Sequence, residues 1–142
     1  MFYGEFEYKV DEKGRVLLPP RFRKDLKDGL VLTPGAEKCL NAYPITEWIK
    51  LAGLLTTSGS LSPSKMRRLT RAIFATAFRL HLDGQGRIAL PLPLRQHASI
   101  EDEIIIAGTN NYLELWNKNE WEAEKAVSQE QAWQIIESLE KR

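Results

Sequence analysis

The sequence contains few of the side chains on which catalysis and metal binding usually depend. Its 142 residues include one cysteine, Cys39, and two histidines, His81 and His97. A single cysteine excludes a disulfide within the chain and fits a reducing compartment, and we expect it to be a small core residue. Catalysis needs a nucleophile or base held against a partner, and no such arrangement or metal-ligand spacing is visible. We therefore predict that the protein is not an enzyme, with no catalytic residue, metal site, cofactor or small-molecule substrate.

Long hydrophobic runs are also missing. No apolar run approaches the ~20 residues that cross a bilayer, and residues 1–5 have neither the basic nor the apolar part of a signal peptide. We expect a cytoplasmic protein with no membrane partner. A chain of 142 residues with 43% hydrophobic and 27% charged side chains has the size and composition of an ordinary globular domain.

The net charge of +1 hides an uneven distribution of charge. Residues 1–76 carry 13 Lys and Arg against 8 Asp and Glu, whereas residues 77–142 carry 7 against 11. Residues 9–27 alone carry seven cations against three acids. A second cationic cluster, without an acid, consists of Lys65, Arg67, Arg68 and Arg71. A basic front and an acidic back suggest a polyanionic partner, with an unevenly charged solvated surface as the alternative.

The most informative feature is an internal repeat. Residues 10–20 read VDEKGRVLLPP, and residues 82–92 read LDGQGRIALPL. The positions that coincide at this offset include Asp11 with Asp83, Gly14 with Gly86, Arg15 with Arg87, Pro19 with Pro91 and Arg23 with Arg95. Self-similarity at a fixed offset indicates a duplicated unit of about 45 residues. Because a unit of that length is barely large enough to fold alone, we expect the two copies to share one core.

Both copies predict the same order of elements: strand, turn, strand, proline-led short helix, two strands and a helix. The predicted fold class is α+β, with two tandem units related by pseudo-twofold symmetry. The units span residues 5–48 and 77–121, a helical connector spans residues 49–76, and a C-terminal helix spans residues 122–142. Ser62 with Pro63 predicts a helix start within the connector, and Asn117 with Glu120 predicts a helix start after the last strand. Ser128 with Gln131 predicts the start of a separate final helix. Its apolar stripe needs a partner in this chain or in a neighbouring subunit, and consists of Ala132, Ile135, Ile136 and Leu139.

The repeated turn has a structural and a functional interpretation. In the structural one, Asp11 accepts N–H groups of the turn, Gly14 adopts a positive φ, and Arg15 folds back on the carboxylate. In the functional one, Arg15 projects from the tip with Lys13 beside it, where it meets a groove or a phosphate. Two such tips would address two sites on a duplex, as the two subunits of a dimer do. The residue pattern alone leaves both interpretations open.

The segment VDEKGRVLLPPRFRKDL resembles the N-terminal DNA-binding unit of the AbrB/SpoVT swapped-hairpin regulators. The whole chain, with two such motifs and the ELW of residues 114–116, resembles the MraZ family. This resemblance implies a double AbrB-like fold and ring-shaped homo-oligomers. It also implies a nucleoid-associated transcriptional regulator that binds repeats in double-stranded DNA upstream of its own division and cell-wall operon. The operator, the sense of regulation and the number of subunits do not follow from the sequence.

Carried over by position, the resemblance assigns DNA-binding roles to Lys13, Arg15, Arg21, Arg23, Lys24 and Arg87. It assigns the turn itself to Asp11, Gly14, Asp83 and Gly86. The second copy has Gln85, Pro93 and Gln96 where the first has cations, so we expect the first unit to make the main DNA contacts. The alternative function is an antitoxin-like protein–protein interaction module, although such antitoxins usually pair a single unit with a disordered tail.

Overall fold

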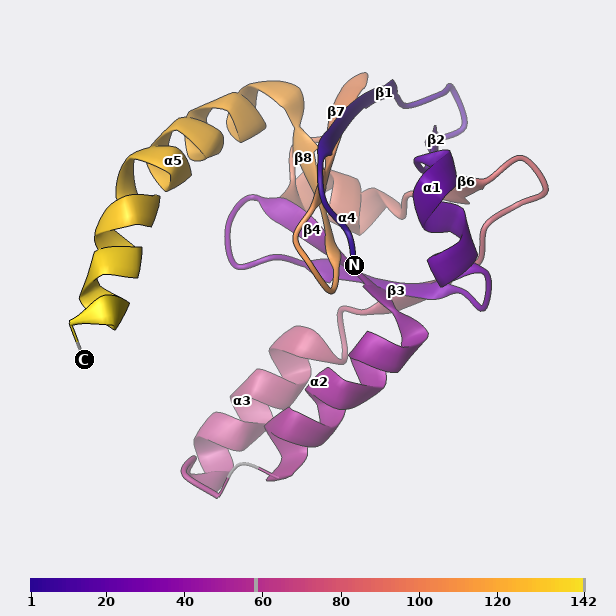
Figure 1. The fold of residues 1–142 in the computed structure, drawn as a ribbon. Helices are drawn as coiled ribbons and strands as arrows, with labels where there is room; N and C mark the ends of the chain where they lie inside the picture. The colour runs from indigo at the N-terminus through magenta and orange to yellow at the C-terminus, as the bar shows by residue number, and fades with distance from the viewer. Residues whose placement is uncertain (58, 142) are drawn as a thin grey trace.

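Both copies of the repeat fold into the same order of strands and helices (Figure 1). The computed structural model describes residues 1–57 and 59–141. The first copy comprises β1 (Glu5–Lys9), β2 (Arg15–Leu17), α1 (Pro20–Arg23), the 3-10 turn η1 (Lys24–Leu26), β3 (Leu30–Pro34), β4 (Cys39–Pro44) and α2 (Ile45–Thr57). After α3 (Pro63–Ile73), the second copy comprises β5 (Phe78–Leu80), β6 (Arg87–Ala89), α4 (Leu92–His97), β7 (Glu103–Gly108), β8 (Leu113–Asn117) and α5 (Lys118–Glu140). The fold class is α+β, as predicted.

The main sheet interleaves the two copies. Its six antiparallel strands follow the order β1-β7-β8-β4-β3-β5, so that β1 of the first copy pairs with β7 of the second. Likewise, β5 of the second copy pairs with β3 of the first. The sheet has pseudo-twofold symmetry, because replacing each strand by its counterpart in the other copy gives the same order in reverse. The symmetry axis passes through the pair of Asn41 in β4 and Glu114 in β8. The edge strands β1 and β5 therefore each form their hydrogen bonds with a strand of the other copy.

A two-stranded ribbon forms the second connection between the copies. The sequence predicts that residues 15–18 return from the turn after β1, but β2 pairs with its counterpart β6 instead. Val16 lies opposite Ile88 at the centre of this ribbon, and each side chain is 1% exposed. A three-residue strand forms few hydrogen bonds by itself. Pairing across the copies gives the ribbon a buried apolar pair, which explains its choice of partner.

One hydrophobic core draws on both copies, as expected from their short length. Leu18 and Leu32 of the first copy pack in the same cluster as Leu90, Leu94 and Ile106 of the second. Burial of each such side chain stabilises the fold by about 1.5–3 kcal/mol. Each copy provides half of the buried residues in this cluster, so neither copy has a complete core by itself. On the other face of the sheet, a smaller cluster contains Cys39, Ile105 and Trp116, with Trp121 of α5 packed against it. The prediction of Cys39 as a core residue is confirmed, since its exposed fraction is 0%.

The helices that extend from this body have clear start signals. Ser62 caps α3 by accepting a hydrogen bond from the Lys65 N–H, with Pro63 at the first helical position. α2 and α3 project from the same side of the body (Figure 1). Trp48 of α2 lies between the sheet and the end of α3, with its ring 5.7 Å from Tyr43 of β4 and 5.3 Å from Phe74, which follows α3.

The prediction of a separate last helix starting at Ser128 is wrong. α5 runs without a break from Lys118 to Glu140, because Asn117 caps its start and residues 118–140 contain neither glycine nor proline. Its first turns pack on the sheet, and its outer half extends away from the body (Figure 1). Across the described ranges, no helix combines the length and apolar character needed to cross a membrane.

Candidate nucleic-acid interface

The first turn is built around the carboxylate of Asp11. Its Oδ1 accepts the backbone N–H of Lys13 at 2.9 Å and that of Arg15 at 2.8 Å, while its Oδ2 accepts Nε–H of Arg15 at 2.9 Å. Gly14 donates its N–H to the Asp11 carbonyl at 3.0 Å and has a φ of 74°, which favours glycine. The turn therefore has the geometry that the structural interpretation expects, and Nε of Arg15 binds the Asp11 carboxylate.

The second turn repeats this geometry. Asp83 accepts the backbone N–H groups of Gln85 and Arg87 at 2.9 and 3.0 Å and the Nε–H of Arg87 at 2.8 Å. Gly86 has a φ of 79°. Hydrogen bonding, led by the backbone N–H of the arginine, lowers the pKa of both aspartates, and it brings the pKa of Asp83 to about 2. Both carboxylates are thus ionised at neutral pH and fix the backbone of their turns.

The ribbon holds the two turns next to each other. Leu18 donates its N–H to the Gly86 carbonyl at 3.0 Å, and Leu90 donates its N–H to the Gly14 carbonyl at 2.9 Å. As a result, Nη1 of Arg87 lies 4.0 Å from Oδ2 of Asp11, across the two copies. The predicted contact residues Arg15 and Arg87 have side chains that are 30% and 24% exposed. Their Nε atoms face the protein.

The remaining predicted cations lie on or beside the short helix of the first copy. Lys13 in the turn and Lys24 in η1 are exposed. Arg21 is also exposed, but its guanidinium lies 4.3 Å from the ring centre of Tyr3 and 5.1 Å from that of Phe6, and it donates to the Tyr3 carbonyl. Arg21 therefore fastens the first residues of the chain to α1, in the manner of a cation–π contact.

Arg23 is half-buried, and its counterpart Arg95 belongs to the same region although it was not among the predicted site residues. Nε of Arg23 donates to the Leu18 carbonyl at 2.9 Å, and Nε of Arg95 donates to the Leu90 carbonyl at 3.0 Å. Each guanidinium lies against the turn glycine of the other copy. The coincidence of these two arginines in the repeat was the available signal for Arg95.

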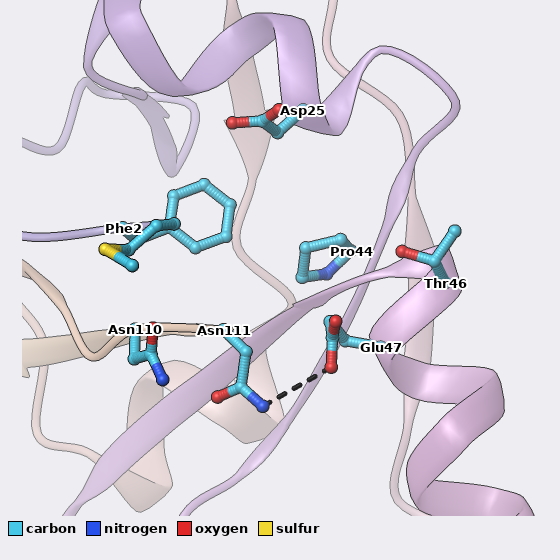
Figure 2. A pocket seen from close by; sticks show the side chains of 8 residues that line it. Phe2, Asp25, Pro44, Thr46, Glu47, Asn110 and Asn111 are labelled. Atoms are coloured by element: carbon cyan, nitrogen blue, oxygen red, sulfur yellow. Dashed lines mark hydrogen bonds between the residues drawn. The ribbon is translucent and has the colours of Figure 1, made fainter.

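Two other places could attract a ligand, but neither fits a nucleic acid. Figure 2 shows a hollow lined by eight residues whose charged side chains, Asp25 and Glu47, are acidic and would repel phosphate. Its Glu47 accepts a hydrogen bond from Asn111 at 3.3 Å. On the sheet, the ligand atoms of Glu37, Cys39 and Glu114 lie within 4.8 Å of one another.

The third residue of that cluster, Glu114, already has two partners. Its carboxylate accepts hydrogen bonds from Nε1 of Trp116 at 3.1 Å and from the hydroxyl of Tyr112 at 3.4 Å. Burial raises the pKa of Glu114, and burial also raises the pKa of Cys39 to about 12. Burial thus disfavours the charged form of both groups on this packed face of the sheet.

The fold and the turns define a class of protein: an α+β domain of two interleaved copies that present paired Asp–Arg turns on one ribbon. The family model described as "MraZ protein, putative antitoxin-like" matches residues 1–71 and 73–139. The chain therefore belongs to the MraZ family.

Three relatives carry the name "Transcriptional regulator MraZ". The chain is 62% identical over 141 residues to one from Dehalococcoides mccartyi, with 99% of each chain covered. It is 43% identical over 122 residues to one from Herpetosiphon aurantiacus, with 86% of this chain and 85% of the other covered. It is 41% identical over 134 residues to one from Deinococcus radiodurans, with 91% and 90% covered.

Proposed function

We propose that the protein is a transcriptional regulator that binds double-stranded promoter DNA through its two Asp–Arg turns. The observation that carries this proposal is the ribbon, which places two turns of one design side by side. The name shared by the relatives supports a role in transcription. The target would be repeated sites upstream of the protein's own division and cell-wall operon, and the place of action the nucleoid within the cytoplasm.

We further infer that the fold consists of two tandem AbrB/SpoVT-like swapped-hairpin units, residues 5–48 and 77–121. In this division, residues 49–76 connect the units, and residues 122–142 are a C-terminal segment that contains most of α5 (Lys118–Glu140). The exchange of β1 and β5 between the copies supports this division, because each unit lends its first strand to the sheet of the other.

In this proposal, each aspartate fixes the orientation of the arginine in its own turn. Oδ2 of Asp11 holds Nε of Arg15, so the guanidinium is fixed before DNA arrives and loses little side-chain entropy on binding. Its Nη groups remain for a guanine edge or a phosphate. Arg87 is held in the same way by Asp83.

Three exposed cations of the first copy would contact phosphates, namely Lys13, Arg21 and Lys24. The counterparts Gln85, Pro93 and Gln96 carry no charge. This difference supports a larger DNA contact for the first unit, with Arg87 as the main basic contact of the second.

Substitution of Arg15 tests the proposal directly. Arg15→Ala should weaken binding to the duplex just upstream of the protein's own reading frame by about 1–3 kcal/mol and reduce the salt slope by about one unit, because one phosphate or base contact is lost. The matched control is Arg79→Ala, which removes an exposed arginine from β5. Fluorescence anisotropy at several salt concentrations measures both quantities. Equal affinities of wild type and Arg15→Ala would remove the first turn from the interface.

We also infer that the protein assembles into a ring-shaped homo-oligomer. Trp133, Ile135 and Leu139 on the outer half of α5 are 72%, 56% and 61% exposed. The same half carries acids and no cation, Glu130, Glu137 and Glu140, whereas α3 carries four cations and no acid. An acidic, apolar helix fits a basic helical pair on the next copy, and repeated head-to-tail contacts of this kind close a ring.

A second candidate function is an antitoxin-like interaction with another protein, which the description of the family as antitoxin-like favours. The exposed apolar stripe of α5 would then bind that protein instead of another copy of the chain. Under this alternative, the duplex-binding experiment gives no sequence-dependent affinity, and the purified chain is monomeric.

A further inference from the structure

Each turn is covered by an arginine of the opposite copy. The guanidinium of Arg95 packs on Gly14, so close that a Cβ at Gly14 would lie 3.1 Å from the Cζ of Arg95. The guanidinium of Arg23 packs on Gly86 more closely still. Since the glycines lie in the positive-φ position of their turns, the arginines cover the backbone where the turns reverse direction.

Both arginines are themselves anchored to the strand end that the turn holds. Nε of Arg95 donates to the carbonyl of Leu90, and the N–H of Leu90 donates to the carbonyl of Gly14. These contacts form a closed circuit from the first turn to the second copy and back. The mirrored circuit joins Arg23, Leu18 and Gly86.

We propose that Arg95 is a positioning residue for the first turn and Arg23 a positioning residue for the second. Arg95 keeps the backbone of Gly14 in place, so that the Asp11 carboxylate stays bonded to the N–H groups of Lys13 and Arg15. The two tips are therefore coupled, since each copy stabilises the tip of the other. Arg23, assigned to DNA by the resemblance, has its Nε committed to the protein.

If each arginine acts across the copies, replacing it should loosen the turn of the other copy and not the turn nearest to it in sequence. Arg95 follows Arg87 by eight positions, and Arg23 follows Arg15 by eight. A local effect of Arg95 would therefore loosen the second turn, and a local effect of Arg23 would loosen the first. With the contacts described above, loss of Arg95 should instead loosen the first turn, and loss of Arg23 should loosen the second.

Hydrogen–deuterium exchange of the full-length variants Arg95→Gln and Arg23→Gln distinguishes these patterns. We expect Arg95→Gln to speed exchange in peptides covering residues 11–17 severalfold more than in residues 83–89, and Arg23→Gln to do the reverse. Peptides from β7 and β8 report on the fold as a whole. Where a glutamine variant unfolds, Arg95→Lys and Arg23→Lys take its place, because lysine keeps the charge but lacks the flat guanidinium. Same-copy loosening, equal loosening of both turns, or unchanged exchange would each overturn the proposal.

The consequence for DNA rests on the proposed function and has its own readout. Arg95→Gln should weaken binding to the upstream duplex about tenfold while leaving the salt slope unchanged, because Arg95 makes no phosphate contact of its own. A slope reduced by about one unit, as expected for Arg15→Ala, would make Arg95 a contact residue and overturn its positioning role. If wild type and Arg15→Ala bind every duplex equally weakly, the proposed function fails, and the exchange experiment alone decides the coupling.

Discussion

At the scale of single residues, the turns depend on carboxylates that accept three hydrogen bonds each. This chemistry lies within five consecutive positions, so Asp11, Gly14 and Arg15 could be interpreted from the sequence. The role of Arg95 could not, because its contact with Gly14 exists only after the two copies come together. For the same reason the aromatic setting of Arg21 was invisible, since Tyr3 and Phe6 reach it from another element.

The ionised state of Asp83 makes stability depend on pH. Its pKa falls from an ordinary 3.8 to about 2 in the folded protein, mainly through the Arg87 N–H. The carboxylate therefore stabilises the fold fully above its ordinary pKa, and this stabilisation is lost as the pH falls toward 2.

Asp83→Asn should consequently show a smaller drop in unfolding temperature between pH 5 and pH 2 than the wild type. Circular dichroism melts across that range measure the difference. Parallel curves for the two proteins would mean that the turn carboxylate does not contribute.

At the scale of elements, local start signals identified two helix starts correctly and one wrongly. Ser62–Pro63 and Asn117 mark the starts of α3 and α5 correctly. Ser128 resembled a new start, but it lies inside a longer helix, where the backbone N–H groups that a cap would accept are already hydrogen-bonded. Serine on an exposed helix face lowers helix stability only slightly. Strand positions were also predictable from alternation, whereas their partners were not, because alternation shows which face is buried and not which strand lies alongside.

Asn117 provides a prediction at this scale. Its Oδ1 accepts the N–H groups of Asn119 and Glu120, and its Nδ2 donates to the Ser99 carbonyl. Asn117→Ala should lower the free energy of unfolding by about 1–2 kcal/mol. Asn117→Asp keeps the cap but loses the donor to Ser99, so it should cost less. Urea titrations compare the three proteins; equal losses for both variants would exclude the cap as the main contribution.

At the scale of the whole molecule, the repeat predicted one shared core and the α+β class, and both are present. It did not predict how far the copies are interleaved. β1, β2 and β5 each pair with a strand of the other copy, and a periodic sequence pattern contains no information about such an exchange. The outer half of α5 remains exposed in the single chain.

Assembly should therefore depend on that helix. Light scattering of the wild type at micromolar concentration is expected to give several chains per particle, and Ile135→Asp should reduce this number by placing a charge on the apolar stripe. Gln134→Asp adds the same charge on the opposite, exposed face of the helix and serves as the control. A monomeric wild type, or an unchanged particle for Ile135→Asp, would contradict the ring.

The interleaved sheet has a consequence for how the two halves can diverge. A single half with this strand pairing would need a second identical chain, and both tips would then have to be the same. With α3 as a covalent tether, the partner is always present at a high effective concentration, and dilution cannot separate the halves. Each tip is then free to change its charge by itself. Under the proposed function, one chain could therefore match an operator whose two halves differ.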